Sequence, residues 1–258
     1  MKAVDMELTE VEFWDEYWAN CRLPNVVDGN FSFDRCLRDE LLRSLAGCRG
    51  EVLEVGCVPG KWLAFMAEDM GLVPSGIDFS KSGVECTLRN LEMLGIEHGR
   101  IVCGDFLKLP ADRRFDVVLS LGFIEHFSDV DAVVGRHLDW LKPGGTLVLG
   151  VPNFRGVYGP IQAVLDKTVL DKHNLEIMST SFFEELGPRF DLILKSVAYI
   201  GSFEPLLPMG RPGVTGPAQF FVKAFLRVCT YIRRLRLFDR LNSRFFSSYI
   251  LAVYTRES

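Results

Sequence analysis

The chain has 258 residues, 48% of them hydrophobic, which is enough to bury a sizeable core in one large domain or in a core domain with insertions. Its formal net charge of −5 gives no general reason to expect nucleic-acid binding. Seven cysteines are dispersed without a CxxC pair, which argues against a disulfide framework or zinc site and for reduced thiols in a cytoplasmic protein.

The N-terminal segment has acidic residues where an export signal needs a basic start, and no run of about 18 uncharged apolar residues exists, so we expect neither a signal peptide nor a membrane span. Thr9 and Glu12 form a capping-box pattern that predicts a helix. Its aromatic residues recur at helical spacing: Phe13, Trp14, Tyr17 and Trp18. A second helix is expected from about 33 to 46, with these side chains buried: Phe33, Leu37, Leu41, Leu42 and Leu45.

From residue 51 onward, short apolar runs alternate with helical patterns. Strands are expected at 51–55, 73–78, 100–105, 115–121 and 146–151, then at 191–200 and 247–255. Helices are expected after 60, at about 81–94, at about 130–141 ahead of a Lys-Pro-Gly-Gly turn, and near 181–186. This alternation predicts a doubly wound α/β fold with a parallel sheet.

Two segments interrupt that alternation, at about 152–178 and about 201–246. We interpret both as insertions near the carboxyl ends of the strands, the edge at which doubly wound sheets bind ligands.

A glycine loop and two acidic residues follow the first three strands. Gly56 and Gly60 allow a sharp turn and a close backbone approach to a ligand, and the loop opens a helix whose free N–H groups face that ligand. Asp78 ends the second strand, where a carboxylate can accept hydrogen bonds from both hydroxyls of a ribose. Asp105 follows the third strand and is placed to accept from an adenine amino group.

The residues beside these acids suit the same ligand. Phe79 and Phe106 are placed to stack on a purine, and the segment from Leu121 carries the chain over the ligand. Cys57 lies inside the glycine loop and is expected to contact the ligand through its backbone rather than as a catalytic thiol.

At this point the sequence resembles the class I methyltransferases over about residues 50–200. The elements that match the family pattern in order and spacing are Glu54, Gly56, Gly60, Asp78, Asp105, Glu125-His126 and the turn 142–145. The resemblance implies a seven-stranded, mostly parallel, Rossmann-like sheet with one antiparallel strand, and S-adenosylmethionine as the cofactor. A dinucleotide is the rival cofactor, but the third glycine of GxGxxG is missing.

One loop position departs from the family, because Val58 stands where glycine is common. Valine would be strained there if the position needs a positive φ, and otherwise it merely narrows the pocket. A non-catalytic binding module therefore stays open as an alternative, as does an enzyme that uses S-adenosylmethionine without transferring methyl.

The acceptor side offers two histidines. His126, after the fourth strand, is the first candidate for a general base, with Glu125 beside it, and His173 in the first insertion is the second. Each could instead be structural. Asn174 and Asn153 are expected to touch the acceptor, unless they only shape loops.

A metal is not expected. A subgroup of the family that methylates quinone-like phenols holds a metal with Glu-x-x-Glu-His, and Gly122 here replaces its first acid.

We expect residues 1–46 to form a helical lid over the methyltransferase domain 47–258, with Tyr17 and Trp18 against the acceptor; simple packing on the sheet is the other reading. The acceptor is expected to be a small molecule, ring-bearing or otherwise hydrophobic, methylated on oxygen, nitrogen, sulfur or carbon. Nucleic acid is not expected as a partner.

The second insertion is basic. Residues 217–246 hold seven Lys or Arg against one acid, Asp239, with Lys223, Arg227, Thr230 and Arg234 in one polar stripe. Such a segment suits a peripheral membrane contact with a lipid-like acceptor, or an acidic partner. Packing on the domain, a share in the acceptor pocket and a homodimer contact remain the alternatives.

Overall fold

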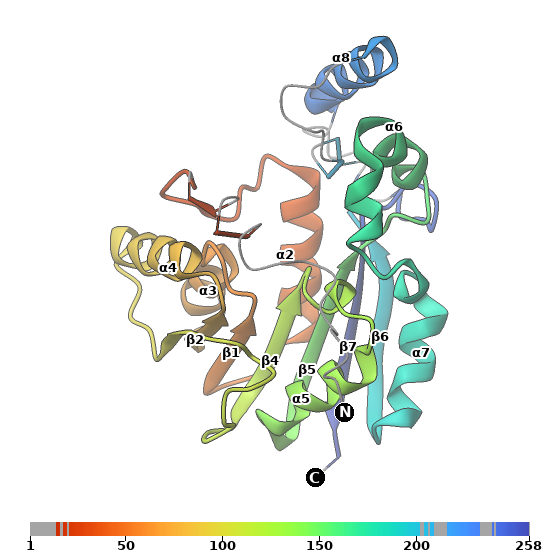
Figure 1. Cartoon of the computed structure of the whole chain (residues 1–258). Coiled ribbons are helices and arrows are strands. Elements are labelled where there is room, and N and C mark those ends of the chain that lie inside the picture. Colours follow the sequence, from red (N-terminus) through yellow and green to blue (C-terminus); the bar gives the residue numbers. More distant parts are fainter. Residues whose placement is uncertain are drawn as a thin grey trace.

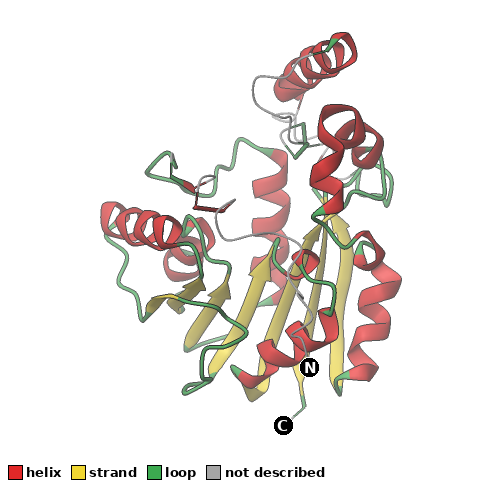
Figure 2. Ribbon diagram, viewed as in Figure 1, coloured by secondary structure: helices red, strands yellow, loops and turns green. Residues whose placement is uncertain are grey.

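The computed structural model describes residues 14–15, 18–19, 21–201, 204–205, 207–208, 216–232, 239 and 241–257 (Figures 1 and 2). Their centre is a seven-stranded sheet of order β3-β2-β1-β4-β5-β7-β6. The strands are β1 Glu51–Val55, β2 Val73–Asp78, β3 Ile101–Cys103, β4 Phe115–Leu121, β5 Leu141–Pro152, β6 Leu192–Ile200 and β7 Tyr249–Arg256. β7 runs antiparallel to both of its neighbours, β5 and β6. The expected doubly wound, mostly parallel sheet is confirmed.

Helices cover both faces of this sheet (Figure 1). They are α2 Ser32–Ser44, α3 Lys61–Glu68, α4 Lys81–Leu94, α5 Val130–Asp139, α6 Tyr158–Asp171, α7 Thr180–Arg189 and α8 Pro217–Ile232, with short 3-10 turns η1 Ile124–His126 and η2 Leu175–Ile177. The helix predicted at 81–94 has these bounds because Ser80 caps its first turn by accepting from the Gly83 N–H, and Gly95 ends it with φ of 67°.

The core divides into two layers because successive strand residues point to opposite faces. Val52 of β1 joins the cluster that includes Leu37 and Leu41 of α2, whereas Leu53 joins the cluster that includes Val133 of α5. Burial on both faces explains why these strands read as continuous apolar runs in the sequence.

Two local expectations were wrong. Leu42 of α2 is 37% exposed rather than buried, because it turns away from the face that Leu37 and Leu41 bury. The Lys-Pro-Gly-Gly segment does not precede the fifth strand but lies inside it. Phe115 pairs with Leu141 and Val117 pairs with Thr146, so residues 142–145 form a bulge in β5.

The described helices α6 and α8 of the two insertions lie beyond the carboxyl edge of the sheet (Figure 1). The first holds α6 and η2, and the second holds α8. The backbone of Val157, ahead of α6, donates to the carbonyl of Phe245 at 2.9 Å, and Gln219 of α8 donates to the Leu165 carbonyl at 3.1 Å. The two insertions therefore pack on one another. In the described part of the chain, none of the helices has the length and apolar character needed to cross a bilayer.

Candidate functional site

A cavity of about 370 Å³ opens at the carboxyl edge of the parallel strands. It is bounded by the ends of β1, β2 and β4, by the segment after β5, and by Trp14 and Trp18 of the N-terminal segment. Its walls are rich in aromatic side chains, among them Trp18, Phe79, Phe106, Phe123, Phe127 and Phe154. A space of this kind takes a ligand with flat or apolar parts.

The loop that follows β1 depends on its glycines. Gly56 has φ of 75° and Gly60 has φ of 82°, both in the left-handed region that favours glycine. A Cβ on Gly60 would lie 2.9 Å from Cγ2 of Thr87 in α4, so the loop can approach α4 because no side chain stands there. Gly56 lines the cavity, whereas Gly60 lies behind it and starts α3.

Val58 lies in that loop without a positive φ, so its backbone is not strained. It lines the cavity, and among the described residues Asp191 is the one non-glycine with a positive φ. Valine therefore narrows the pocket and does not distort its backbone.

Three acidic side chains stand at the edge predicted to hold the cofactor. Asp78 is 8% exposed and accepts a hydrogen bond from the Ser80 N–H at 2.9 Å, and burial raises its pKa to about 7. Glu54 is 3% exposed, burial raises its pKa to about 8, and its Oε2 has no hydrogen-bond partner among the described residues. Asp105 lines the cavity and forms an ion pair with Lys108 at 2.6 Å.

These groups fit S-adenosylmethionine. A buried carboxyl oxygen without a donor is costly, and a ligand carrying hydroxyl and ammonium donors removes that cost. Asp78 and Phe79 line the same cavity as Asp105 and Phe106, as a ribose and an adenine bound side by side require. Leu121 also lines it, and Cys57 is buried behind the loop against Gly76.

Asp15 of the N-terminal segment is hydrogen-bonded beside the cofactor residues, a contact that the sequence analysis did not single out. Ser80 donates to its Oδ1 at 2.6 Å, and Ser82 donates to its backbone carbonyl at 3.0 Å. The hydrogen bonds that Ser80 and Ser82 donate to its carboxylate lower the pKa of Asp15. Trp14 meets His126 edge to face with ring centroids 5.1 Å apart, and Trp18 lines the cavity, whereas Tyr17 lies outside the described residues.

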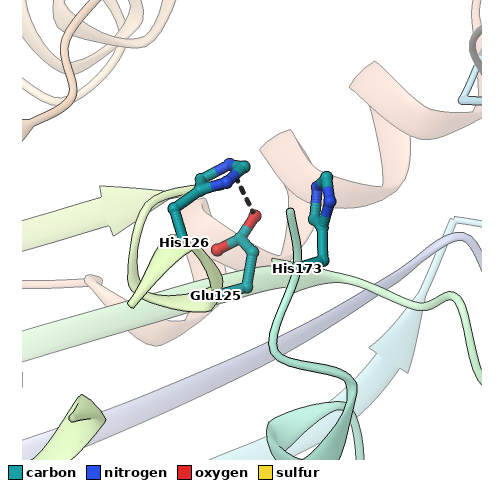
Figure 3. A group of neighbouring side chains, drawn as sticks. All are labelled: Glu125, His126 and His173. Carbon is teal, nitrogen blue, oxygen red and sulfur yellow. Dashed lines mark ion pairs between the residues drawn. The ribbon is translucent and has the colours of Figure 1, made fainter. Parts of the chain in front are cut away.

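Glu125, His126 and His173 meet in the wall of the cavity (Figure 3). Glu125 and His126 come from η1, and His173 follows α6. Nε2 of His126 lies 3.8 Å from Oε1 of Glu125, and the two imidazole rings are 4.6 Å apart. Nδ1 of His126 is hydrogen-bonded to the Lys172 carbonyl at 3.1 Å, and Nδ1 of His173 to the Val169 carbonyl at 2.6 Å. A neutral ring that donates from Nδ1 presents its lone pair at Nε2.

Burial sets the charges of this cluster. It raises the pKa of Glu125 to about 8 and lowers the pKa of His126 to about 3. It also lowers the pKa of His173. At neutral pH the carboxyl therefore holds a proton and both rings are neutral.

The same three side chains are a donor set that a divalent metal could use, because their ligand atoms lie within 4.8 Å of one another. The sequence argument against a metal considered Gly122 alone. It did not foresee His173, which the fold brings to Glu125 from a distant segment.

Asn153 and Asn174 do not line the cavity but hydrogen-bond to the segments that form its walls. Asn153 is fully buried, and its Nδ2 donates to the carbonyls of Arg244 and Ser247, each at 2.9 Å. The Asn174 backbone donates to the Glu125 carbonyl at 2.7 Å, and its Nδ2 donates to the Phe127 carbonyl at 3.3 Å. Their hydrogen bonds connect the insertions to the strand ends.

Tyr249 is a wall residue that the sequence analysis missed. It is 6% exposed and lines the cavity, and burial together with the nearby Glu125 and Glu54 raises its pKa well above the ordinary tyrosine value. Because β7 is antiparallel, its first residue pairs with Pro152 at the carboxyl edge of β5. The expected antiparallel last strand was the signal that could have predicted Tyr249 here, because such a strand begins at the edge where its parallel neighbour ends.

Comparison with known proteins agrees with this geometry. Residues 52–145 match the family model described as a methyltransferase domain. A ubiquinone biosynthesis O-methyltransferase of Bradyrhizobium sp. ORS 278 is 32% identical over 114 residues, which are 43% of each chain. The methyltransferase GfsG of Streptomyces halstedii is 28% identical over 157 residues, or 58% of this chain and 55% of that protein. The chain thus spans about half the length of the curated relatives it matches.

Among solved structures, the geranyl diphosphate C-methyltransferase of Streptomyces coelicolor A3(2), in complex with Mg²⁺, geranyl diphosphate and S-adenosyl-L-homocysteine, has a TM-score of 0.60 at 14% identity. The match covers 95% of this chain and 97% of that one. The sheet order, the glycine loop and the acids at the ends of β1 and β2 and after β3 define a Rossmann-like domain that suits an adenosine-containing cofactor. Residues 52–145 thus match a methyltransferase domain, and the chain is similar to S-adenosylmethionine-dependent methyltransferases, the resemblance that the sequence predicted.

Proposed function

We propose that this protein transfers the methyl group of S-adenosylmethionine to a hydroxyl or amino group of a small, ring-bearing acceptor. The observation that carries the proposal is that one cavity contains both sets of residues. Asp78 and Asp105 lie on its cofactor side, and His126 and His173 lie on its acceptor side. Direct transfer needs donor and acceptor in one water-excluding space.

The positions of the acidic and aromatic residues around the cavity support the following roles toward the cofactor. Asp78 would accept from the ribose hydroxyls and Asp105 from the adenine amino group, while Phe79 and Phe106 would cover the purine. The Gly56 backbone approaches the ligand closely, and Glu54 supplies an acceptor behind it. When bound, S-adenosylmethionine supplies a methyl group activated by the departure of a neutral thioether.

The acceptor side supplies position and a proton acceptor. Trp18, Phe127 and Phe154 line the cavity with apolar surface, which favours a ring-bearing or otherwise hydrophobic acceptor. His126 receives the acceptor's proton at Nε2. At high pH Glu125 ionises, and its negative charge 3.8 Å from Nε2 makes the ring a stronger base.

This assignment predicts the pH dependence of the rate. The pKa of Glu125 is about 8, so kcat should rise as the pH passes through that value and should lose the rise in Glu125→Gln. His173 is positioned to orient the acceptor beside His126.

The test is an acceptor screen that measures S-adenosylhomocysteine release, with phenols, other hydroxylated rings and ring amines as acceptors. For the best acceptor, His126→Ala should lower kcat by about 10²–10⁴-fold. His98→Ala, which removes an exposed histidine of a distant loop, is the matched control and should leave kcat unchanged. Equal kcat values for His126→Ala and His98→Ala would contradict the proton-acceptor role.

The structure removes the one observation that favoured a non-catalytic binding module as the alternative function. That alternative rested on a distorted loop at Val58, and Val58 does not have a positive φ.

A further inference from the structure

The outer face of α8 carries a stripe of exposed apolar side chains. The exposed fractions are 60% for Phe220, 71% for Phe221, 58% for Phe225, 63% for Val228 and 71% for Tyr231. Their spacing repeats every three or four residues, so they form one face of the helix. Leu226 and Cys229 are buried on a different face. A helix that only needed to pack on the domain would bury its aromatic face, and this helix exposes it.

Two basic residues and a neutral polar one flank that stripe. Lys223, Arg227 and Thr230 follow one another at helical spacing beside the apolar face, and α8 contains no acid. Residues 217–246 hold seven basic residues in a chain whose net charge is −5. The one acid there, Asp239, is already paired with Arg35 at 2.8 Å. Of these basic residues, Lys223 and Arg227 lie on α8 itself, beside the exposed apolar side chains.

The position of α8 connects this surface to the cavity. Figure 1 places α8 beyond α6, away from the sheet. Gln219 donates to the Leu165 carbonyl of α6, and the later part of that same helix supplies Val169 to the cavity wall, with His173 just after it. The surface therefore belongs to the acceptor side of the molecule.

We propose that α8 docks in the plane of an anionic membrane surface, with its apolar stripe at the level of the lipid headgroups and its basic flank against the phosphates. Aromatic side chains on one face and Lys or Arg beside them are the features by which a helix lies on a bilayer. An acidic protein would pair with the charges but would leave the aromatic stripe exposed. Docking does not depend on methyl transfer. If the proposed function also holds, the acceptor is an amphiphile that enters the apolar cavity from the membrane.

The test is co-sedimentation of the full chain with vesicles of phosphatidylcholine alone and with about 30% phosphatidylglycerol added. The protein should sediment with the anionic vesicles, and binding should weaken steeply as salt is raised. Phe221→Ser and Tyr231→Ser should each weaken binding about tenfold or more, because each removes an inserted side chain. Arg227→Glu should weaken binding to anionic vesicles most.

Met93→Ser is the matched control, because Met93 is 59% exposed on α4, on another part of the surface, and its loss should leave vesicle binding unchanged. Calorimetry with S-adenosylhomocysteine shows separately that each variant is folded. A protein that stays in the supernatant with anionic vesicles, or Phe221→Ser that binds them as the parent does, overturns the proposal. A dimer that Phe221→Ser dissociates, without vesicle binding, would make this face an interface between two copies and would overturn it as well.

Discussion

Protonation of Asp78 should control cofactor affinity near neutral pH. Burial raises the pKa of this carboxyl to about 7, and the carboxylate is the form that accepts from two ribose hydroxyls. Ligand binding therefore competes with a proton, and affinity should increase with pH. With a pKa of about 7, the ionised fraction rises from about one tenth at pH 6 to about nine tenths at pH 8, so Kd should fall about tenfold across that interval.

The probe for this prediction is 5′-methylthioadenosine, which has the ribose and adenine but no titrating amino-acid part. Calorimetric titrations at half-unit steps from pH 6 to pH 8 give the slope. Asp78→Asn should remove the slope and weaken binding at pH 8 by about 1.5–3 kcal/mol, or about 10- to 150-fold, because hydrogen bonds to a charged group are lost. Asp39→Asn, at an exposed carboxylate, is the control. A parent protein whose Kd is the same at pH 6 and pH 8, or an Asp78→Asn variant that keeps the slope, refutes the reasoning.

Three further predictions concern the loop, the core and the histidine cluster. Gly60→Ala should destabilise the fold by about 1–3 kcal/mol in chemical denaturation, because φ is 82° and the new Cβ meets Thr87, whereas Gly135→Ala inside α5 should be neutral or stabilising. His137 is fully buried and its pKa is lowered to about 4, so the neutral ring's contribution is present above the ordinary value of 6.5 and is lost as pH falls toward 4. Between pH 7 and pH 4 the parent should lose up to about 3 kcal/mol relative to His137→Phe, and parallel stability curves would contradict this. A chelator should leave the methylation rate unchanged, because protonated Glu125 and the neutral rings of His126 and His173 carry no charge that a cation must balance. Loss of activity that Mn²⁺ restores would instead make the cluster a metal site.

The sequence predicted the sheet well, and it singled out the acidic residues at its edge, because both signals depend on local patterns. A strand buried on both faces is a short apolar run, and Asp78 is recognisable because it stands directly after such a run. Ser80 and Gly95 define the ends of α4 through capping and a left-handed turn. None of these signals requires knowledge of distant residues.

The acceptor side could be predicted only in part, because its geometry comes from contacts between distant segments. His126 and His173 were both candidates, yet their meeting beside Glu125 depends on how the first insertion folds back. Asn153 was expected near the acceptor, but its amide is used by backbone carbonyls more than 90 positions away in the chain. Leu42 is exposed because the face of α2 that packs on the sheet is narrower than the apolar pattern indicated.

The central claim is that this cavity binds S-adenosylmethionine, and calorimetric titration of the purified protein tests it most directly. The structure predicts that S-adenosylmethionine and S-adenosylhomocysteine each bind at one site per chain with micromolar Kd, and that Asp78→Asn weakens both. Absence of binding by either compound at millimolar concentration, in protein shown to be folded, would contradict the account.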